Sequence, residues 1–407
     1  MNINKNILIL TQWSFKDPLI QAYTLPYVFI IAKQLPIGSK IYLVTFEQEK
    51  LKMAPSEKTV FKKMLKGKGV FLIDYNYSSF GIISFIKWAG VILHLFTLIF
   101  LKKIKFIHAW CTTAGSLGYI LSKASGKPLI IDSYEPHAEA MVENKTWSPK
   151  GLKFKLLFFL EKSQTRHAKI LISATKGMHD YALEKYKVNI SNYYVKPACV
   201  DLTKFNISKR KNPALLSQLK LANKIVCVYA GKFGGIYLTK EVFDFFSAAE
   251  KFWGDRFRVL LLTPHDKETL FKWAIDSNFS TDKMVIRYVS HDQIPEYLGV
   301  GDFGITPVKS TPTKRFCTPI KDGEYWALGL PVVISRDISD DSGIILKNNA
   351  GAVINEYTEE NYKFAIEQIN KLLEEPLPSL SIRIENLANR YRNFSIAEDI
   401  YKKIYKN

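Results

Sequence analysis

The chain has 407 residues, of which 47% are hydrophobic and 23% are charged. This length favours two domains, and this composition excludes a largely disordered, collagen-like or linker protein. The four cysteines include no close pair, which argues against zinc ribbons, redox motifs and disulfide scaffolds. Such cysteine usage favours a reducing compartment, and we expect a cytoplasmic protein.

The positive charge is concentrated in the first half of the chain. Residues 1–200 contain 28 basic and 12 acidic side chains, whereas residues 201–407 contain 29 and 26. A basic half predicts an anionic partner for that half, such as a membrane surface, a phosphate-bearing substrate or nucleic acid. Nucleic acid is disfavoured because the sequence contains no known RNA- or DNA-binding module. Solubility alone is the alternative explanation.

Short β-branched runs alternate with helix-length segments along the whole chain, which predicts α/β domains built on parallel sheets. The apolar start of the chain is typical of a strand rather than of a signal peptide. The pattern breaks near residues 195–201, so we predict two Rossmann-like domains, 1–199 and 200–393, with a cleft between them. The expected strands are 7–11, 40–46, 69–74, 106–110, 128–133 and 169–174, then 224–230, 257–263, 284–289, 303–307, 331–335 and 351–354.

One long apolar segment, 82–101, approaches the composition of a transmembrane helix. Lys87, Gly90 and His94 interrupt it, and a lysine cluster follows at 102–105. These features favour a helix that lies partly on an anionic membrane surface. A plain buried helix is the alternative.

A glycine-rich turn opens the second domain. The predicted strand 224–230 runs into Gly231, Lys232, Gly234 and Gly235, and Lys240 follows at the start of a helix. Glycines let backbone N–H groups approach a phosphate, and two lysines near that turn can reach a diphosphate. The alternative is a tight strand-to-helix turn with two solvated lysines.

A second motif lies at 318–333, where Pro319 marks a helix start. Glu324 falls within the first two turns of that helix, and its carboxylate can accept hydrogen bonds from both hydroxyls of a ribose. Backbone amides near Thr318 and Ile320 can meet phosphate. A surface pair of Lys321 and Glu324, three residues apart, is the alternative.

Together the two motifs resemble the retaining glycosyltransferases of family 4, which have the GT-B fold, from Asn6 to the last helix. The resemblance implies that Lys232 and Lys240 bind the donor diphosphate. The segment 319–333 looks like the family motif P-x-K-x-x-E-Y-x-A-x-G-x-P-V-V, which implies that Glu324 holds the nucleotide ribose. The amphipathic tail 394–407 is similar to the family's closing helix, which packs back on the first domain.

The sequence departs from the family pattern in two places. The usual E-x7-E arrangement would put a glutamate at Phe316, so the resemblance does not assign the donor sugar. The Gly-Gly of the first loop is also absent, and Asp17, Pro18 and Gln21 stand in that place.

In the first domain, Glu135 and His137 follow the predicted strand 128–133. Family members usually carry a histidine near the reacting sugar in this region, and these two residues are the nearest matches. Either could orient or deprotonate an acceptor hydroxyl. A helix-start glutamate and a surface histidine are the alternative.

The sequence therefore predicts transfer of a sugar from a nucleotide-diphosphate sugar to an acceptor, such as a lipid-linked cell-envelope glycan. Dinucleotide, P-loop, kinase and nucleophile-elbow motifs are absent, and the histidines are far apart in the sequence. We expect neither a metal nor another cofactor. A GT-B epimerase or hydrolase, and a non-catalytic glycan-binding protein, remain alternatives.

Overall fold

The computed structural model describes residues 4–78 and 82–406, and the side chains of 82–85 lie outside the described residues. The chain divides into two compact units. Unit 1 contains Met1–Lys196 and Ser395–Asn407, and unit 2 contains Pro197–Phe394. The first crossing between the units thus follows Lys196, three residues before the boundary expected from the sequence.

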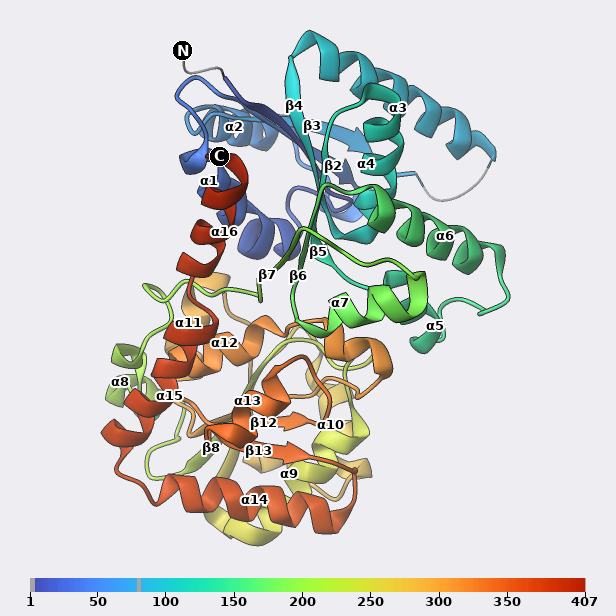
Figure 1. Ribbon diagram of the computed structural model, residues 1–407. Coiled ribbons are helices and arrows are strands. Elements are labelled where there is room, and N and C mark those ends of the chain that lie inside the picture. The colour runs from blue at the N-terminus through green and yellow to red at the C-terminus, as the bar shows by residue number, and fades with distance from the viewer. Residues whose placement is uncertain (1–3, 79–81, 407) are drawn as a thin grey trace. The chain divides into compact units, whose positions relative to one another are not determined.

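Unit 1 is built on a seven-stranded parallel sheet in the order β3-β2-β1-β4-β5-β6-β7 (Figure 1). Its central strands are apolar and buried, as expected for a sheet covered on both faces. The strands are β1 (Asn6–Leu10), β2 (Ile41–Glu47), β3 (Val70–Asn76), β4 (Ile104–Trp110), β5 (Leu129–Tyr134), β6 (Ile170–Ser173) and β7 (Tyr193–Val195). Six of them match the predicted strands, and β7 is an additional one of three residues.

Helices cover both faces of this sheet. Right-handed crossovers place α1 and α2 on one face and α3, α4 and α6 on the other. The C-terminal helix α16 packs on α1, whereas α4 packs on both α3 and α6. The helices of unit 1 are α1 (Leu25–Gln34), α2 (Pro55–Lys66), α3 (Ile82–Leu101), α4 (Cys111–Ser125), α5 (His137–Glu143), α6 (Leu152–His167), α7 (Gly177–Tyr181) and α16 (Ser395–Tyr405).

Unit 2 has a six-stranded parallel sheet in the order β10-β9-β8-β11-β12-β13. Its strands are β8 (Ile225–Ala230), β9 (Phe257–Leu262), β10 (Met284–Arg287), β11 (Phe303–Thr306), β12 (Val332–Ser335) and β13 (Gly351–Ile354). All six match the predicted strands. The sheet and its helices enclose one continuous apolar core.

The helices of unit 2 also form two layers. On one face α14 packs on α9, and on the other α15 packs on α12. The helices are α8 (Pro213–Gln218), α9 (Lys240–Trp253), α10 (Lys267–Asp276), α11 (Ile294–Gly299), α12 (Ile320–Ala327), α13 (Asp341–Lys347), α14 (Glu359–Leu373) and α15 (Leu377–Tyr391). Short 3₁₀ or π turns occur in the two units at 19–24, 49–51, 182–186, 207–209, 254–256, 281–283, 291–293 and 312–316.

The strand order of each sheet reverses once, between β1 and β4 in unit 1 and between β8 and β11 in unit 2. Loops after strands on either side of such a reversal run in opposite directions, which leaves room for a ligand at the carboxyl edge of the sheet. Both predicted motifs of unit 2 flank its reversal, because the glycine-rich turn follows β8 and the 318–333 motif follows β11.

Candidate functional site

The glycine-rich turn after β8 requires its glycines. Gly231 has a φ of 156°, and a Cβ there would lie 2.8 Å from the Tyr229 hydroxyl and 2.9 Å from Lys321 Cε. Gly234 and Gly235 adopt φ values of 80° and 61°. Any larger side chain at position 231 would therefore displace its neighbours, so the backbone there stays open to close approach.

Hydrogen bonds hold this turn against the end of β11. The Leu238 N–H donates to the Pro307 carbonyl at 2.7 Å, and the Lys309 N–H donates to the Ile236 carbonyl at 3.0 Å. The Lys309 ammonium also donates to the Gly235 carbonyl at 2.8 Å. The turn is thus fixed across the point where the strand order reverses.

Helix α12 brings Lys321 to the glycine-rich turn. Pro319 precedes the helix with an extended backbone, and the N–H groups of the first turn have no partners within the helix. The Lys321 ammonium lies 5.1 Å from the centre of the Tyr237 ring and 5.8 Å from that of Tyr229. The Lys321 side chain therefore lies beside Gly231, and a cation that extends from the amino end of a helix can bind an anion.

Glu324 lies one turn after Lys321 on α12. Burial raises the pKa of its carboxyl group to about 7, and the charge of Lys321 opposes that rise. Among the residues that the structure describes, none donates a hydrogen bond to the Glu324 carboxylate. A half-buried carboxylate with unused acceptor capacity can bind hydroxyl groups of a ligand.

The other predicted site residues of unit 2 differ in their exposure and in the partners that they contact. Lys232 is exposed, and its carbonyl accepts a hydrogen bond from the Tyr229 hydroxyl at 2.5 Å. Lys240 is exposed at the start of α9 and forms an ion pair with Asp244 at 2.8 Å, which raises its pKa. Thr318 lies 3.3 Å from Ser339, hydroxyl to hydroxyl.

Ile320 begins α12, which places its backbone N–H at the amino end of the helix. Phe316, which stands where the family pattern has a glutamate, is buried with 7% of its surface exposed. Lys309 is not among the residues expected from the sequence, because its contact with the turn arises only where β8 and β11 are adjacent.

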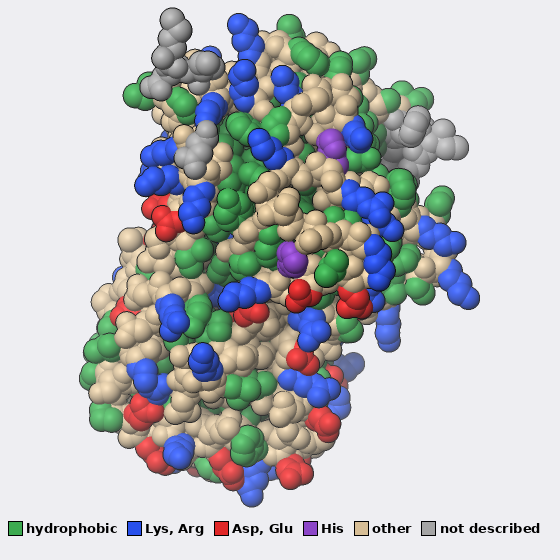
Figure 2. All heavy atoms as spheres, in the orientation of Figure 1, with side chains coloured by type: hydrophobic (Ala, Val, Ile, Leu, Met, Phe, Trp, Pro, Cys, Tyr) green, Lys and Arg blue, Asp and Glu red, His purple; other side chains and the backbone are tan. Residues whose placement is uncertain are grey.

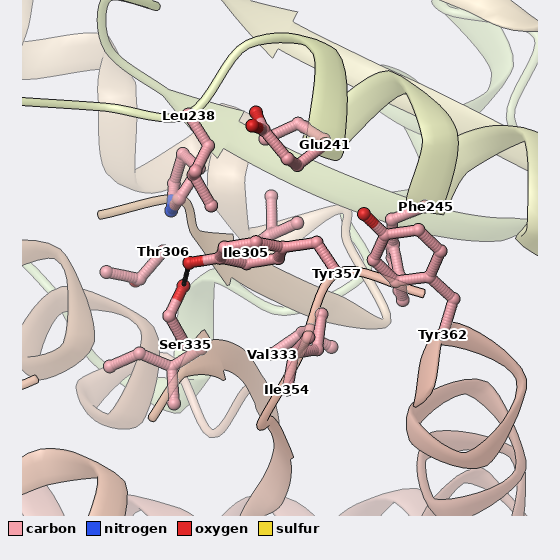
Figure 3. Close-up of a pocket in the computed structure, with 13 residues that line it drawn as sticks. Leu238, Glu241, Phe245, Ile305, Thr306, Val333, Ser335, Ile354, Tyr357 and Tyr362 are labelled. Carbon is pink, nitrogen blue, oxygen red and sulfur yellow. Dashed lines mark hydrogen bonds between the residues drawn. The ribbon is translucent and has the colours of Figure 1, made fainter. Parts of the chain in front are cut away.

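A small cavity in unit 2 lies apart from these residues. It has a volume of about 10 Å³, which suits about one water molecule, and its lining includes Glu241, Tyr357 and Tyr362. The Tyr357 hydroxyl donates to Ser335 Oγ at 3.1 Å across it (Figure 3). None of the predicted site residues lines this cavity, which is too small for a nucleotide.

In unit 1, Glu135 and His137 lie together at the carboxyl end of β5. His137 is the first residue of α5, and its Nδ1 is 3.5 Å from Glu135 Oε1. Each of the two side chains is about one-third exposed, at 31% for Glu135 and 32% for His137. They form an accessible acid–base pair on a unit separate from Glu324.

A buried carboxylate that the sequence analysis did not identify supports this end of α5. Glu161 on α6 accepts hydrogen bonds from the Ala138 N–H and the Tyr186 hydroxyl, both at 3.0 Å. Burial raises its pKa to about 7, although these bonds and the charge of His137 oppose the rise. Glu161 therefore fixes the helix turn that carries His137.

A second buried cluster in unit 1 surrounds Asp132 on β5. Lys196 forms an ion pair with it at 3.2 Å, and the Tyr401 hydroxyl of α16 donates to it at 2.6 Å. Burial alone would raise the pKa of Asp132, but Lys196 and His108 hold it at about 2. Because Asp132 is 64 residues from Lys196 and 269 residues from Tyr401 in sequence, no local pattern indicates this cluster.

The first loop uses its polar groups internally. The Gln21 side-chain amide donates to the Phe15 carbonyl at 2.6 Å, and Asp17 accepts from the Leu19 N–H at 2.8 Å. Pro18 precedes the π turn at 19–24. These contacts shape the loop itself.

Neither a metal cluster nor a membrane span is found in the part of the chain that the structure describes. No group of three His, Cys, Asp or Glu side chains there could hold a metal ion. No helix there, including α3, is both long and apolar enough to cross a bilayer.

Two Rossmann-like domains with parallel sheets of seven and six strands define the GT-B fold. The chain superposes on sucrose-phosphate synthase from Thermosynechococcus elongatus with a TM-score of 0.71 at 13% identity, over 99% of this chain and 98% of that one. It superposes on Anabaena HepE in complex with UDP with a TM-score of 0.69 at 13% identity, over 98% and 99%.

A third solved structure, that of WaaG, a glycosyltransferase involved in lipopolysaccharide biosynthesis, gives a TM-score of 0.70 at 12% identity, over 99% of this chain and all of that one. No family model and no curated protein sequence matches the chain. At these identities the likeness establishes the fold.

Proposed function

We propose that this protein is a retaining glycosyltransferase that moves a sugar, of the hexose class, from a nucleotide-diphosphate sugar to an acceptor. The observation that carries the proposal is the meeting of Gly231, Lys321 and Glu324 at the strand reversal of unit 2. An open backbone turn, a cation and a half-buried carboxylate suit the diphosphate and the ribose of such a donor. The fold shared with HepE in complex with UDP-glucose supports this proposal.

In the proposed donor complex, Glu324 accepts hydrogen bonds from the ribose hydroxyls. Lys321, Lys232 and the first N–H groups of α12 face the diphosphate, and Lys240 contributes when it leaves Asp244. These groups act on the charge that develops as the bond between the sugar carbon and the diphosphate oxygen breaks. No metal or other cofactor takes part in the proposed reaction.

The acceptor hydroxyl forms the new bond to the sugar carbon and loses its proton. Glu135 and His137 are the proposed residues that orient this hydroxyl or accept its proton, because they are accessible and lie 3.5 Å apart. Retention of the anomeric configuration is proposed from the resemblance of the 319–333 motif.

The proposed acceptor is a lipid-linked or cell-envelope glycan, which would place the protein on the inner face of the cell membrane. Lys and Arg side chains outnumber acidic ones on the visible face of unit 1, whereas both signs are interspersed on unit 2 (Figure 2). The sequences of the three helices α3, α4 and α6 contain one acidic residue, Glu161, and its side chain is buried. This layer is therefore suited to an anionic bilayer surface.

Helix α6 supports the membrane proposal because its buried face is polar and its exposed face is apolar, the reverse of an ordinary surface helix. Its fully buried side chains are polar, namely Glu161, Gln164 and Thr165. Leu152 and Phe159 are instead 81% and 62% exposed, with lysines beside them. On α3, Leu93 and Leu101 are likewise 67% and 73% exposed. Exposed apolar side chains among lysines are typical of helices that lie on membrane surfaces.

Calorimetric binding of UDP, GDP, ADP, CMP and their sugars to the wild type and to Glu324→Ala tests the donor site. We expect tight binding of one nucleotide class and its loss in the variant. Product analysis with and without acceptor, with the anomeric configuration read by NMR, then separates transfer from hydrolysis or epimerisation. A wild type that binds none of these nucleotides would contradict the proposal.

A further inference from the structure

Helix α12, which carries Lys321 and Glu324, rests on a buried charged network. Asp322, two residues before Glu324, is fully buried and accepts a hydrogen bond from the Thr306 hydroxyl. Burial and the like charge of Asp341 hold the pKa of Asp322 well above its usual range. The side chains of Asp322 and Asp341 are therefore close enough to interact, which extends the network from α12 to Asp341.

The charge of Asp341 is balanced by Arg392. Arg392 Nη2 lies 2.5 Å from each carboxylate oxygen of Asp341, and both residues are 1% exposed. The guanidinium group also lies 5.2 Å from the Trp326 ring on α12. The network therefore runs from the start of α13 and the end of α15 into the buried face of α12.

Arg392 also lies two residues before the end of unit 2, which is Phe394. Its carbonyl accepts a hydrogen bond from the Val200 N–H at 2.8 Å, so the incoming and outgoing segments of unit 2 run side by side. A Cβ at Gly323 would lie 2.7 Å from Val200 Cγ2 and 2.9 Å from Arg392 Cγ. Both segments thus pack against α12 at Gly323, one residue before Glu324.

We propose that Asp341 and Arg392 are positioning residues that set the orientation of α12 and thereby aim the Glu324 carboxylate at the nucleotide ribose. The inference rests on the proposed donor site. An eight-residue helix has few hydrogen bonds of its own, so its orientation depends on what its buried face contacts. The contact of Nη2 with both oxygens of Asp341 and the position of the guanidinium group over the Trp326 ring together hold that buried face.

Arg392→Lys tests this role because it keeps the charge but removes the planar guanidinium group, which contacts Asp341 through Nη2 and lies over the Trp326 ring. Titration with UDP, with GDP and ADP in parallel, is carried out on the wild type, Arg392→Lys, Glu324→Ala and the double variant. If Arg392 acts through Glu324, the substitution weakens UDP binding about tenfold in the wild-type background and by a clearly smaller factor in the Glu324→Ala background, where Lys321 and the N–H groups of α12 alone remain to be displaced. A purely structural role would give the same factor in both backgrounds and would overturn the inference.

Arg383→Gln is the matched control on the same helix, α15. Arg383 contacts Glu375 and the carbonyls of Asn348 and Asn349 rather than α12. We expect this variant to lose thermal stability while its UDP affinity stays within twofold of the wild type. If UDP affinity falls equally in both arginine variants, α12 has no special link to Arg392 and the inference is wrong.

Two further choices keep the test decisive. Asp341→Asn replaces Arg392→Lys if the latter does not fold, and Glu324→Gln serves as the background if Glu324→Ala binds too weakly to titrate. If the wild type binds none of the three nucleotides, both the proposed function and this inference are wrong. If the wild type binds UDP and Arg392→Lys binds it equally well, this inference is wrong and the proposed function stands.

Discussion

Lys196 and Asp132 form an ion pair in which neither side chain is exposed, with 3.2 Å between Nζ and Oδ1. Arg392 and Asp341 form the corresponding pair in unit 2. Lys196 is the last residue of unit 1 before the first crossing, and Arg392 lies two residues before the second. Each connection between the units therefore begins at a cation that is buried within the unit it leaves.

We expect Lys196→Ala to destabilise unit 1 by about 3–5 kcal/mol, because it leaves the Asp132 carboxylate buried without its main counter-charge. Urea unfolding followed by tryptophan fluorescence measures this loss. Lys251→Ala is the control, since Lys251 pairs with Glu359 at an exposed site and should cost less than about 1 kcal/mol. Equal losses in the two variants would contradict the importance of the buried pair.

The same pair predicts a loss of stability in acid. The pKa of Asp132 in the folded protein is about 2, below the ordinary value of 3.8. The unfolded chain therefore binds a proton first, so this contribution is complete above about pH 5 and disappears as the pH falls through about 2. Its size is on the order of 2 kcal/mol. Unfolding measured from pH 6 to pH 2 should show an acid loss that is smaller in Asp132→Asn, and identical profiles would refute it.

Glu324→Gln should stabilise the free protein while it weakens nucleotide binding. The folded pKa of about 7 lies above the ordinary 4.5, so the ionised carboxylate costs stability as the pH rises from about 4.5 to 7. The variant should therefore gain on the order of 1–3 kcal/mol at pH 8 and little at pH 5. Thermal melts with and without UDP at both pH values measure this, and a stability gain at pH 5 alone would contradict it.

Lys321 should matter more for donor binding than Lys240. Lys321 packs against Gly231, whereas Lys240 is held by Asp244 on the surface. We expect Lys321→Ala to weaken UDP binding at least tenfold and Lys240→Ala less than fivefold. Calorimetric titration at constant salt compares them, and the reverse ranking would move the proposed diphosphate site toward α9.

Phe159→Glu combined with Leu152→Glu should abolish binding to vesicles that contain anionic lipid, because the two most exposed apolar side chains of α6 become acidic. Lys102, Lys103 and Lys105, replaced together by alanine, should weaken binding in a salt-dependent way. Ile275→Glu on unit 2, which is exposed to 65%, is the control. Vesicle co-sedimentation measures all three, and unchanged binding of the α6 variant would disprove its role.

Sequence patterns were sufficient for the fold because parallel strands buried on both faces carry continuous apolar runs. All twelve predicted strands are present, in two sheets. β7 escaped prediction because Tyr193–Val195 is only three residues long and partly exposed. The glycine-rich turn and the 319–333 motif were also visible, since each is a local pattern with a local cause, such as the positive φ of Gly231.

Tertiary structure alone decided which charged groups meet. Lys321, rather than Lys240, contacts the glycine-rich turn, because the adjacency of β8 and β11 brings the start of α12 to that turn. Lys196 lies 64 positions from its partner Asp132, and Arg392 lies 51 positions from its partner Asp341. No local sequence pattern predicts either pair. The sequence determines which strands and turns can form, since these depend on neighbouring residues. Burial and ionisation depend on long-range packing, which the folded chain alone defines.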